Sequence, residues 1–267
     1  MQRDNWKFLT LQRSGRVLEV QFNSHTKVNS LNSALMRELT ALAQQLHFDS
    51  ELSAIVLTGQ PHTFSAGMDL KDPETSQLAQ MSVAERRQVV KVGPAMCAAW
   101  EALEPVTIAA IEGWCIGGGA ALAVSCDWRI AASDAMFYVP EVKLGMNMSW
   151  QSVPRFNALI GPAKTKELLI LAEPVDAATA LHWGLYDRVS EPGAAVATAH
   201  DLAAQVAARP PIPVRMAKEA INASALPLAE AVARMDRDQF LLAVSTEDAR
   251  EGAVAFFEKR EPDFKGN

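Results

Sequence analysis

Cysteine is scarce in this 267-residue sequence, and its three positions, Cys97, Cys115 and Cys126, include no Cys-x-x-Cys pair. An odd count without such spacing argues against a disulfide framework and fits a reducing compartment. The five histidines are scattered, and no carboxylate–histidine spacing suggests a metal site. We therefore expect no metal ion and no permanently bound cofactor.

Long apolar runs and basic clusters are also missing. The most apolar uncharged stretch, residues 113–126, contains four glycines and falls short of the ~20 residues that a membrane-spanning helix needs. The N-terminal MQRDNWKFLT has no apolar segment after it, so no secretion signal is expected. With a net charge of −6 and no Lys/Arg cluster, nucleic-acid binding is not expected as the main role. We expect a cytoplasmic protein that acts neither on nucleic acid nor at a membrane.

The remaining composition, 49% hydrophobic and 21% charged, can support one large core. Apolar periodicity predicts strands at residues 7–12, 16–23, 52–58, 106–111, 128–132 and 136–139. It predicts helices at 31–47, at about 78–103 and at 120–126, and almost continuously after residue 161. Alternating strands and helices predict an α/β core with mostly parallel pairing, and the helical end predicts a separate packing layer.

Two glycine-containing segments follow predicted strands, namely Phe64–Leu70 (FSAGMDL) and Gly113–Ala120 (GWCIGGGA). Glycines let backbone N–H groups approach a ligand closely, and a helix that begins there adds the positive end of its dipole. Such fixed donors suit a site where negative charge develops on oxygen. The spacing matches neither a P-loop, nor a dinucleotide-binding loop, nor a G-x-S-x-G elbow.

A third segment, VPEVKLG, places Glu141 among apolar neighbours after two short predicted strands. Burial there would raise the pKa of the carboxyl group towards neutrality, as a group that both takes and returns a proton requires. A loop carboxylate is by itself as often a surface charge. Together, the three segments point to acid/base chemistry on a substrate that develops negative charge.

These motifs, with the stretch LIGPAKTKELLILAEPVDAATALHWGLYDRV and the final FFEKREPDFKG, resemble the crotonase (enoyl-CoA hydratase/isomerase) superfamily over nearly the whole chain. The resemblance implies a spiral of repeated ββα units in residues 1–190 that carries an acyl-CoA site. It implies a helical trimerisation region in residues 191–267, and a homotrimer or a hexamer made of two trimers. It also implies that a coenzyme A thioester is the substrate and that its carbonyl oxygen becomes an enolate.

The resemblance also assigns roles to residues of this chain. The backbone N–H groups of Met68 and Gly118 would form the oxyanion hole, and Glu141 would be the catalytic acid/base. Phe256 and Lys259, in the last helix, would act across a subunit interface. The substrate or its coenzyme A part would be contacted by Lys27, Ala66, Asp69, Leu70, Lys71, Trp114, Gly117, Ala121, Leu144, Trp150, Phe256 and Lys259.

One departure from the family pattern bears on the reaction. Hydratases of the family carry two glutamates, one at the position of Ala121 and one at the position of Glu141. Isomerases that convert 3-enoyl to 2-enoyl thioesters resemble this sequence, because they keep only the glutamate at the position of Glu141. A single base can move a double bond by taking a proton from one carbon and returning it to another. We therefore favour a double-bond isomerase that uses Glu141.

Two alternatives stay open. One is a hydratase in which a residue outside the usual position, or a water held by Ser149 or Asn147, compensates for Ala121. The other is a non-catalytic binding protein with this fold. Dienoyl isomerases are less favoured, because they carry a further acidic residue at the position where this chain has Ser149. Enzymes that hydrate and cleave phenylpropenoyl thioesters are also less favoured. They carry a tryptophan and a tyrosine in the pocket at the positions where this chain has Leu144 and Pro73. The segment 146–150 (MNMSW) would give the acyl pocket a largely apolar wall.

Overall fold

The structure is a computed structural model that describes residues 6–227 and 229–267. The strands are β1 (Leu9–Ser14), β2 (Val17–Phe22), β3 (Ala54–Thr58), β4 (Thr63–Ser65), β5 (Val106–Ile111), β6 (Trp114–Ile116), β7 (Trp128–Ala132), β8 (Met136–Tyr138), β9 (Val175–Asp176) and β10 (Arg188–Ser190). The α-helices are α1 (Ser33–Leu46), α2 (Pro73–Ser76), α3 (Val83–Val89), α4 (Val92–Glu101), α5 (Gly118–Val124), α6 (Ser152–Lys166), α7 (Ala177–Trp183), α8 (Ala195–Ala207), α9 (Pro211–Ala225), α10 (Ala229–Ala243) and α11 (Glu247–Glu258). Short helical turns form η1 (Leu78–Gln80), η2 (Glu141–Leu144) and η3 (Glu167–Leu171).

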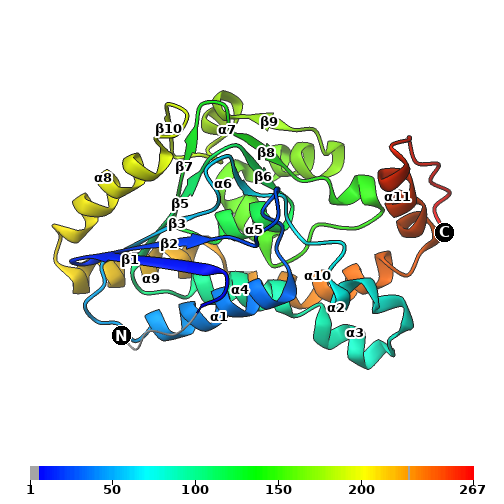
Figure 1. Ribbon diagram of the computed structural model, residues 1–267, viewed down its shortest axis with the longest axis horizontal. Coiled ribbons are helices and arrows are strands. Elements are labelled where there is room, and N and C mark those ends of the chain that lie inside the picture. Colours follow the sequence, from blue (N-terminus) through cyan, green and yellow to red (C-terminus); the bar gives the residue numbers. More distant parts are fainter. Residues whose placement is uncertain (1–5, 228) are drawn as a thin grey trace.

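The strands form a large sheet in the order β1-β2-β3-β5-β7-β10 and a small sheet in the order β4-β6-β8-β9. The β1–β2 hairpin and the β8–β9 pair are antiparallel, and the other pairs are parallel. Three times in succession the chain adds one strand to the large sheet, then one to the small sheet, and then turns into a helix. This repeat, seen around the middle of Figure 1, confirms the expected α/β spiral of ββα units.

The large sheet is buried on both faces, which is why its central strands read as continuous apolar runs. All five residues of β3 are buried, and alternate ones belong to different clusters: Ile55 and Leu57 to the main core, Val56 to a second core. That second core is completed by α8, which lies along the outer face of the sheet (Figure 1). The predicted boundary at residue 190 stays a prediction, and the first helix after it packs on the sheet.

One helix expected to be continuous is interrupted. Instead of one element over 78–103, the chain forms η1, α3 and α4. A new helix begins after Ser82, because the Ser82 hydroxyl accepts from the Glu85 N–H (3.3 Å) while the Glu85 carboxylate accepts from the Ser82 N–H (2.8 Å). This capping box starts a new helix after Ser82 and so divides the segment.

The C-terminal helices α9 to α11 follow the spiral, and α11 stands at the edge of the molecule next to η2 (Figure 1). Close packing there depends on two glycines. A Cβ at Gly252 would lie 2.6 Å from the Leu144 carbonyl carbon, and one at Gly145 would lie 2.6 Å from the Ala249 Cα. In the ranges that the structure describes, no helix is both long and apolar enough to cross a bilayer.

Candidate active site

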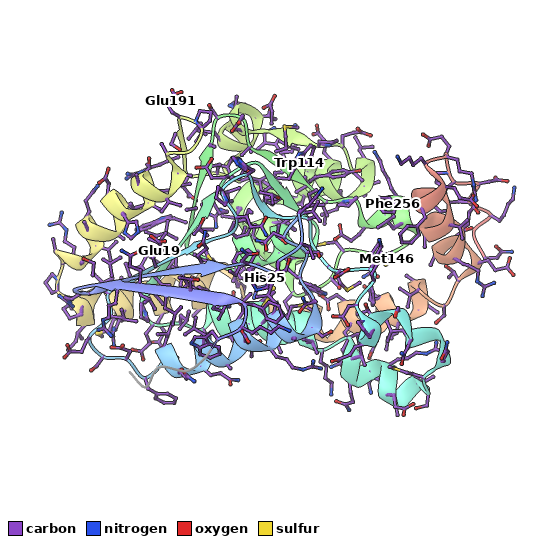
Figure 2. All side chains as sticks on the ribbon, viewed as in Figure 1. Glu19, His25, Trp114, Met146, Glu191 and Phe256 are labelled. Atoms are coloured by element: carbon purple, nitrogen blue, oxygen red, sulfur yellow. The ribbon has the colours of Figure 1, made fainter. Side chains whose placement is uncertain are left out.

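A cavity of about 400 Å³ opens where the ends of the small-sheet strands meet α10 and α11. Figure 2 shows Met146 and Phe256, both part of its lining, in the region between the body of the molecule and α11. Nine residues expected from the sequence to form the site line this cavity: Ala66, Met68, Leu70, Gly117, Gly118, Glu141, Leu144, Trp150 and Phe256. Phe256 lines the cavity of its own chain, and its expected role across a subunit interface stays a prediction.

Gly67 brings the two glycine-containing loops together. Its φ of +83° lies in the left-handed region, and a Cβ there would be 2.7 Å from the Ile116 carbonyl oxygen and 3.0 Å from the Gly118 nitrogen. Only glycine satisfies both the backbone conformation and the close approach. As a result, the chain around Met68 runs beside the start of α5.

The hydrogen bonds around Met68 leave its N–H free. Leu31 N–H donates to the Gly67 carbonyl (2.7 Å) and Asp69 N–H donates to the Leu31 carbonyl (3.0 Å), which is a parallel bridge between Leu31 and Met68. In such a bridge the N–H of Met68 itself faces away from Leu31. At the first position of α5, the N–H of Gly118 has no intrahelical acceptor. Among the described residues, no group accepts a hydrogen bond from either N–H.

Glu141 stands beside these donors. Gly117, at φ +51°, has no side chain, and a Cβ there would lie 2.6 Å from Oε1 of Glu141. The Gly117 N–H donates to the Tyr138 carbonyl (2.8 Å), which ties the start of α5 to the end of β8 just before Glu141. The carboxylate therefore lies beside Gly117, at the start of α5.

The carboxyl group of Glu141 lies in an apolar environment. Its Oε2 is buried and has no hydrogen-bond partner among the described residues. Burial raises the pKa of Glu141 to about 7. The group can therefore take up and release a proton near neutral pH, as a group serving as both acid and base must.

Six other residues expected to form the site lie outside the cavity lining. Ala121 is fully buried in the main core, one turn into α5. Trp114 is 42% exposed and packs on Tyr138 with 6.5 Å between ring centroids. None of these six residues lines the cavity, so contact with the substrate or its coenzyme A part stays a prediction for Lys27, Asp69, Lys71, Trp114, Ala121 and Lys259.

Some lining residues were not expected. Tyr138 and Lys143 flank Glu141, and the Lys143 ammonium pairs with Glu173 (2.9 Å) and lies 5.9 Å from the Tyr138 ring centroid. Lys143 could have been proposed as a site residue, because it belongs to the PEVKLG motif. No sequence pattern around Phe240 of α10 indicates a site, and this residue reaches the cavity only because the fold brings α10 there. Arg260 and its neighbours also line the cavity from the C-terminal segment, where Arg260 pairs with Glu251 (2.5 Å).

The geometry agrees with comparisons to known proteins. Residues 12–267 match the family model described as enoyl-CoA hydratase/isomerase. The chain belongs to the enoyl-CoA hydratase/isomerase family. Because the match spans almost all of the sequence, the expectation of this family from the sequence motifs is confirmed, and with it an enzyme of acyl-CoA metabolism.

Several known proteins resemble this chain over nearly all of its length. It is 34% identical to the short-chain-enoyl-CoA hydratase of Clostridium acetobutylicum over 94% of each chain. It is 30% identical to the crotonyl-CoA hydratase of Syntrophomonas wolfei over 96% of this chain and 97% of that one. The crystal structure of an enoyl-CoA hydratase/isomerase from Pseudoalteromonas atlantica superposes with a TM-score of 0.84 at 27% identity, covering 97% and 100% of the two chains.

Proposed function

We propose that this enzyme moves a carbon–carbon double bond of an acyl-CoA thioester from the 3- to the 2-position, with Glu141 as its only acid/base. The observation that carries the proposal is the carboxyl group of Glu141, whose Oε2 is buried, beside two backbone N–H groups that have no acceptor among the described residues. Burial raises the pKa of that carboxyl to about 7. The other acid of the cavity lining, Glu261, is exposed on the C-terminal segment.

The proposed reaction needs one base and one oxyanion site. The Glu141 carboxylate removes a proton from C2 of the 3-enoyl thioester, and the electron pair passes into the carbonyl to give a dienolate. The N–H groups of Met68 and Gly118 donate to the resulting oxyanion, and the dipole of α5 supports the donor at Gly118. Glu141, now protonated, returns the proton to C4, and the product is the 2-enoyl thioester.

The position of Ala121 supports isomerisation over hydration. Hydration requires a water that is held and deprotonated while a proton is delivered to C2, and two carboxylates commonly share this task in the family. At position 121 the side chain is a methyl group with 0% exposure, packed in the core. It can neither hold a water nor accept a proton.

The test is a comparison of 3-enoyl-CoA and 2-enoyl-CoA of several chain lengths, followed by product analysis. Conversion of the 3-enoyl thioester with little 3-hydroxyacyl product would support the proposal. Fast hydration of the 2-enoyl thioester would reject it.

Hydration is the second candidate, and two observations favour it. The relatives named above are hydratases. In addition, the side-chain oxygen of Asn147, a cavity residue, is buried without a donor among the described residues, while its amide nitrogen donates to the Met148 carbonyl (3.3 Å). A water between Asn147 and Glu141 would serve hydration. The same product analysis decides, because this arrangement gives the 3-hydroxyacyl thioester.

We expect the rate to follow the ionisation of Glu141. Since the carboxylate form is the base and its pKa is raised to about 7, kcat/KM should rise roughly tenfold per pH unit below pH 7 and level off above it. A pH–rate profile with 3-enoyl-CoA measures this. A profile that stays flat down to about pH 5, near the ordinary pKa of glutamate, would contradict the assigned role of Glu141.

We also propose that the enzyme assembles as a homotrimer or as a hexamer of two trimers. Helix α9 exposes three large apolar side chains, Ile212 (68%), Met216 (64%) and Ile221 (62%), and exposed apolar groups of this kind are typical of a face that is covered in an assembly. Sedimentation equilibrium should give three or six times the chain mass of 29.0 kDa. A species with the mass of one chain would contradict the expectation.

A further inference from the structure

Trp150 separates the main cavity from a second space. That adjoining cavity, of about 30 Å³, lies among α1, α3, α4 and α10 and is lined largely by aliphatic side chains such as Met36, Val89 and Val92. Met68, Ser149, Trp150 and Phe240 border both spaces. The Trp150 indole is the largest of these four side chains.

Two glycines form the seat of the indole. A Cβ at Gly93 of α4 would lie 2.2 Å from Cε2 of Trp150, and one at Gly118 of α5 would lie 2.5 Å from Cζ3. Neither glycine has a positive φ, so the backbone conformation does not demand glycine at either position. The room that they leave is used by the indole ring, which therefore packs directly on the residue whose N–H is the proposed oxyanion donor.

The backbone that carries Trp150 is fixed in a costly conformation. Trp150 (φ +60°) and Gln151 (φ +59°) are consecutive left-handed residues without being glycine, at a cost of roughly 1–2 kcal/mol each. Asp236 accepts from the Gln151 N–H (2.9 Å), and Arg155 donates to the carbonyls of Gln151 (2.7 Å) and Trp150 (3.3 Å). Asp236 and Arg155 are 2% and 4% exposed. These hydrogen bonds from buried side chains maintain the strained backbone at Trp150 and Gln151, and so fix the position from which the indole ring projects.

We propose that Trp150 is the specificity-determining wall of the acyl site and limits the substrate to short acyl chains. The inference rests on the acyl-CoA binding part of the proposed function. A thioester oxygen held at Gly118 places C2 to C4 of the acyl group close to the ring that packs on the same residue. Carbons beyond them meet the indole, and the apolar space behind it is out of reach.

Binding of saturated acyl-CoA thioesters with four to twelve carbons tests the wall without depending on turnover, because these thioesters carry no double bond to move. Isothermal titration calorimetry would compare the wild type with Trp150→Ala, with Trp150→Phe and with Phe48→Ala. Phe48, which is 84% exposed, controls for the loss of an aromatic ring elsewhere.

For the wild type and Phe48→Ala we expect affinity to stop rising after the short chains. For Trp150→Ala we expect it to keep rising, by about fourfold for each further methylene buried, so that the best-bound chain is longer by at least about two carbons. Trp150→Phe should fall between them. The same chain-length profile in wild type and Trp150→Ala would overturn the inference while leaving the proposed reaction intact.

The remaining outcomes are also decisive. A shifted profile together with no double-bond movement would reject the proposed reaction and support the wall. If no acyl-CoA binds to either protein, the proposed function and the wall both fail.

A thermal double-mutant cycle checks the seat of the ring in folded protein. Gly93→Ala should lower the Tm of the wild type, because the new Cβ meets the indole, and should leave the Tm of Trp150→Ala unchanged or raise it, because alanine favours a helix. If Gly93→Ala lowered the Tm equally in the wild type and in Trp150→Ala, the indole would not pack against Gly93. The proposed position of Trp150 as the wall of the acyl site would then be wrong.

Discussion

Glu141→Gln is expected to lower kcat/KM for a 3-enoyl thioester by about a thousandfold or more, within the range by which positioned acid/base groups accelerate reactions. Glutamine has nearly the same shape, but its amide can neither accept the C2 proton nor return it to C4. The buried Oε2 of Glu141 has no partner among the described residues, so no protein hydrogen bond is lost with it. The affinity for a saturated acyl-CoA should therefore change little.

A matched control separates this effect from a general effect of removing a negative charge. Glu191, which is exposed and lies far from Met146 and Phe256 in Figure 2, can be changed to glutamine in the same way. Glu191→Gln should keep wild-type kcat/KM. If Glu141→Gln kept more than about a tenth of it, another group would be the acid/base.

The same variant has a second expected result, in stability. Because the folded-state pKa of Glu141 is raised to about 7, above its unfolded value of about 4.5, ionisation is less favourable in the native state. This loss of stability is absent below pH 4.5, grows between pH 4.5 and 7, and is complete above pH 7. Relative to the wild type, Glu141→Gln should therefore gain stability as pH rises, by about 3 kcal/mol between pH 4 and pH 8 in urea unfolding. A constant difference between pH 4 and pH 8 would contradict the raised pKa.

Ala121→Glu is expected to destabilise the protein by at least about 3 kcal/mol and to yield no hydratase. The site is completely buried in the main core, and the new carboxylate would have to be accommodated there without a partner. One turn earlier on the same face of α5, Gly118 is already covered by the Trp150 ring.

Ala121→Gln separates volume from charge. It should share the loss that comes from overpacking, while the additional loss of Ala121→Glu, measured by urea unfolding at pH 7, reports the buried charge. A folded Ala121→Glu protein that hydrates 2-enoyl-CoA would show that only the carboxylate was missing, and that the shape of the site never excluded hydration.

Much of the fold was visible in the sequence, because the central strands are buried on both faces. Runs such as Val106–Ile111 and Trp128–Ala132 read as strands at their observed bounds. The break in the segment 78–103 was missed because apolar spacing continues across it. The capping box of Ser82 and Glu85 that causes the break is a local signal and could have been used.

The site was predictable where backbone chemistry defines it and not where distant elements meet. Met68, Gly118 and Glu141 were found from loops with recognisable residue patterns. Phe240 could not be found, since only the packing of α10 brings it to the cavity. Likewise, nothing local to Trp150 shows that the left-handed backbone at Trp150 and Gln151 is held by Asp236, which lies 85 residues beyond Gln151 in the chain.

The most direct measurement follows a label through the reaction. With 3-enoyl-CoA that carries deuterium at C2, a single carboxyl group that removes and returns the hydrogen predicts that part of the deuterium appears at C4 of the 2-enoyl product, because we expect the bound thioester to keep water away from the protonated Glu141 during the transfer. Product that carries no deuterium at C4, or a 3-hydroxyacyl thioester in its place, would contradict the transfer of hydrogen by Glu141 alone.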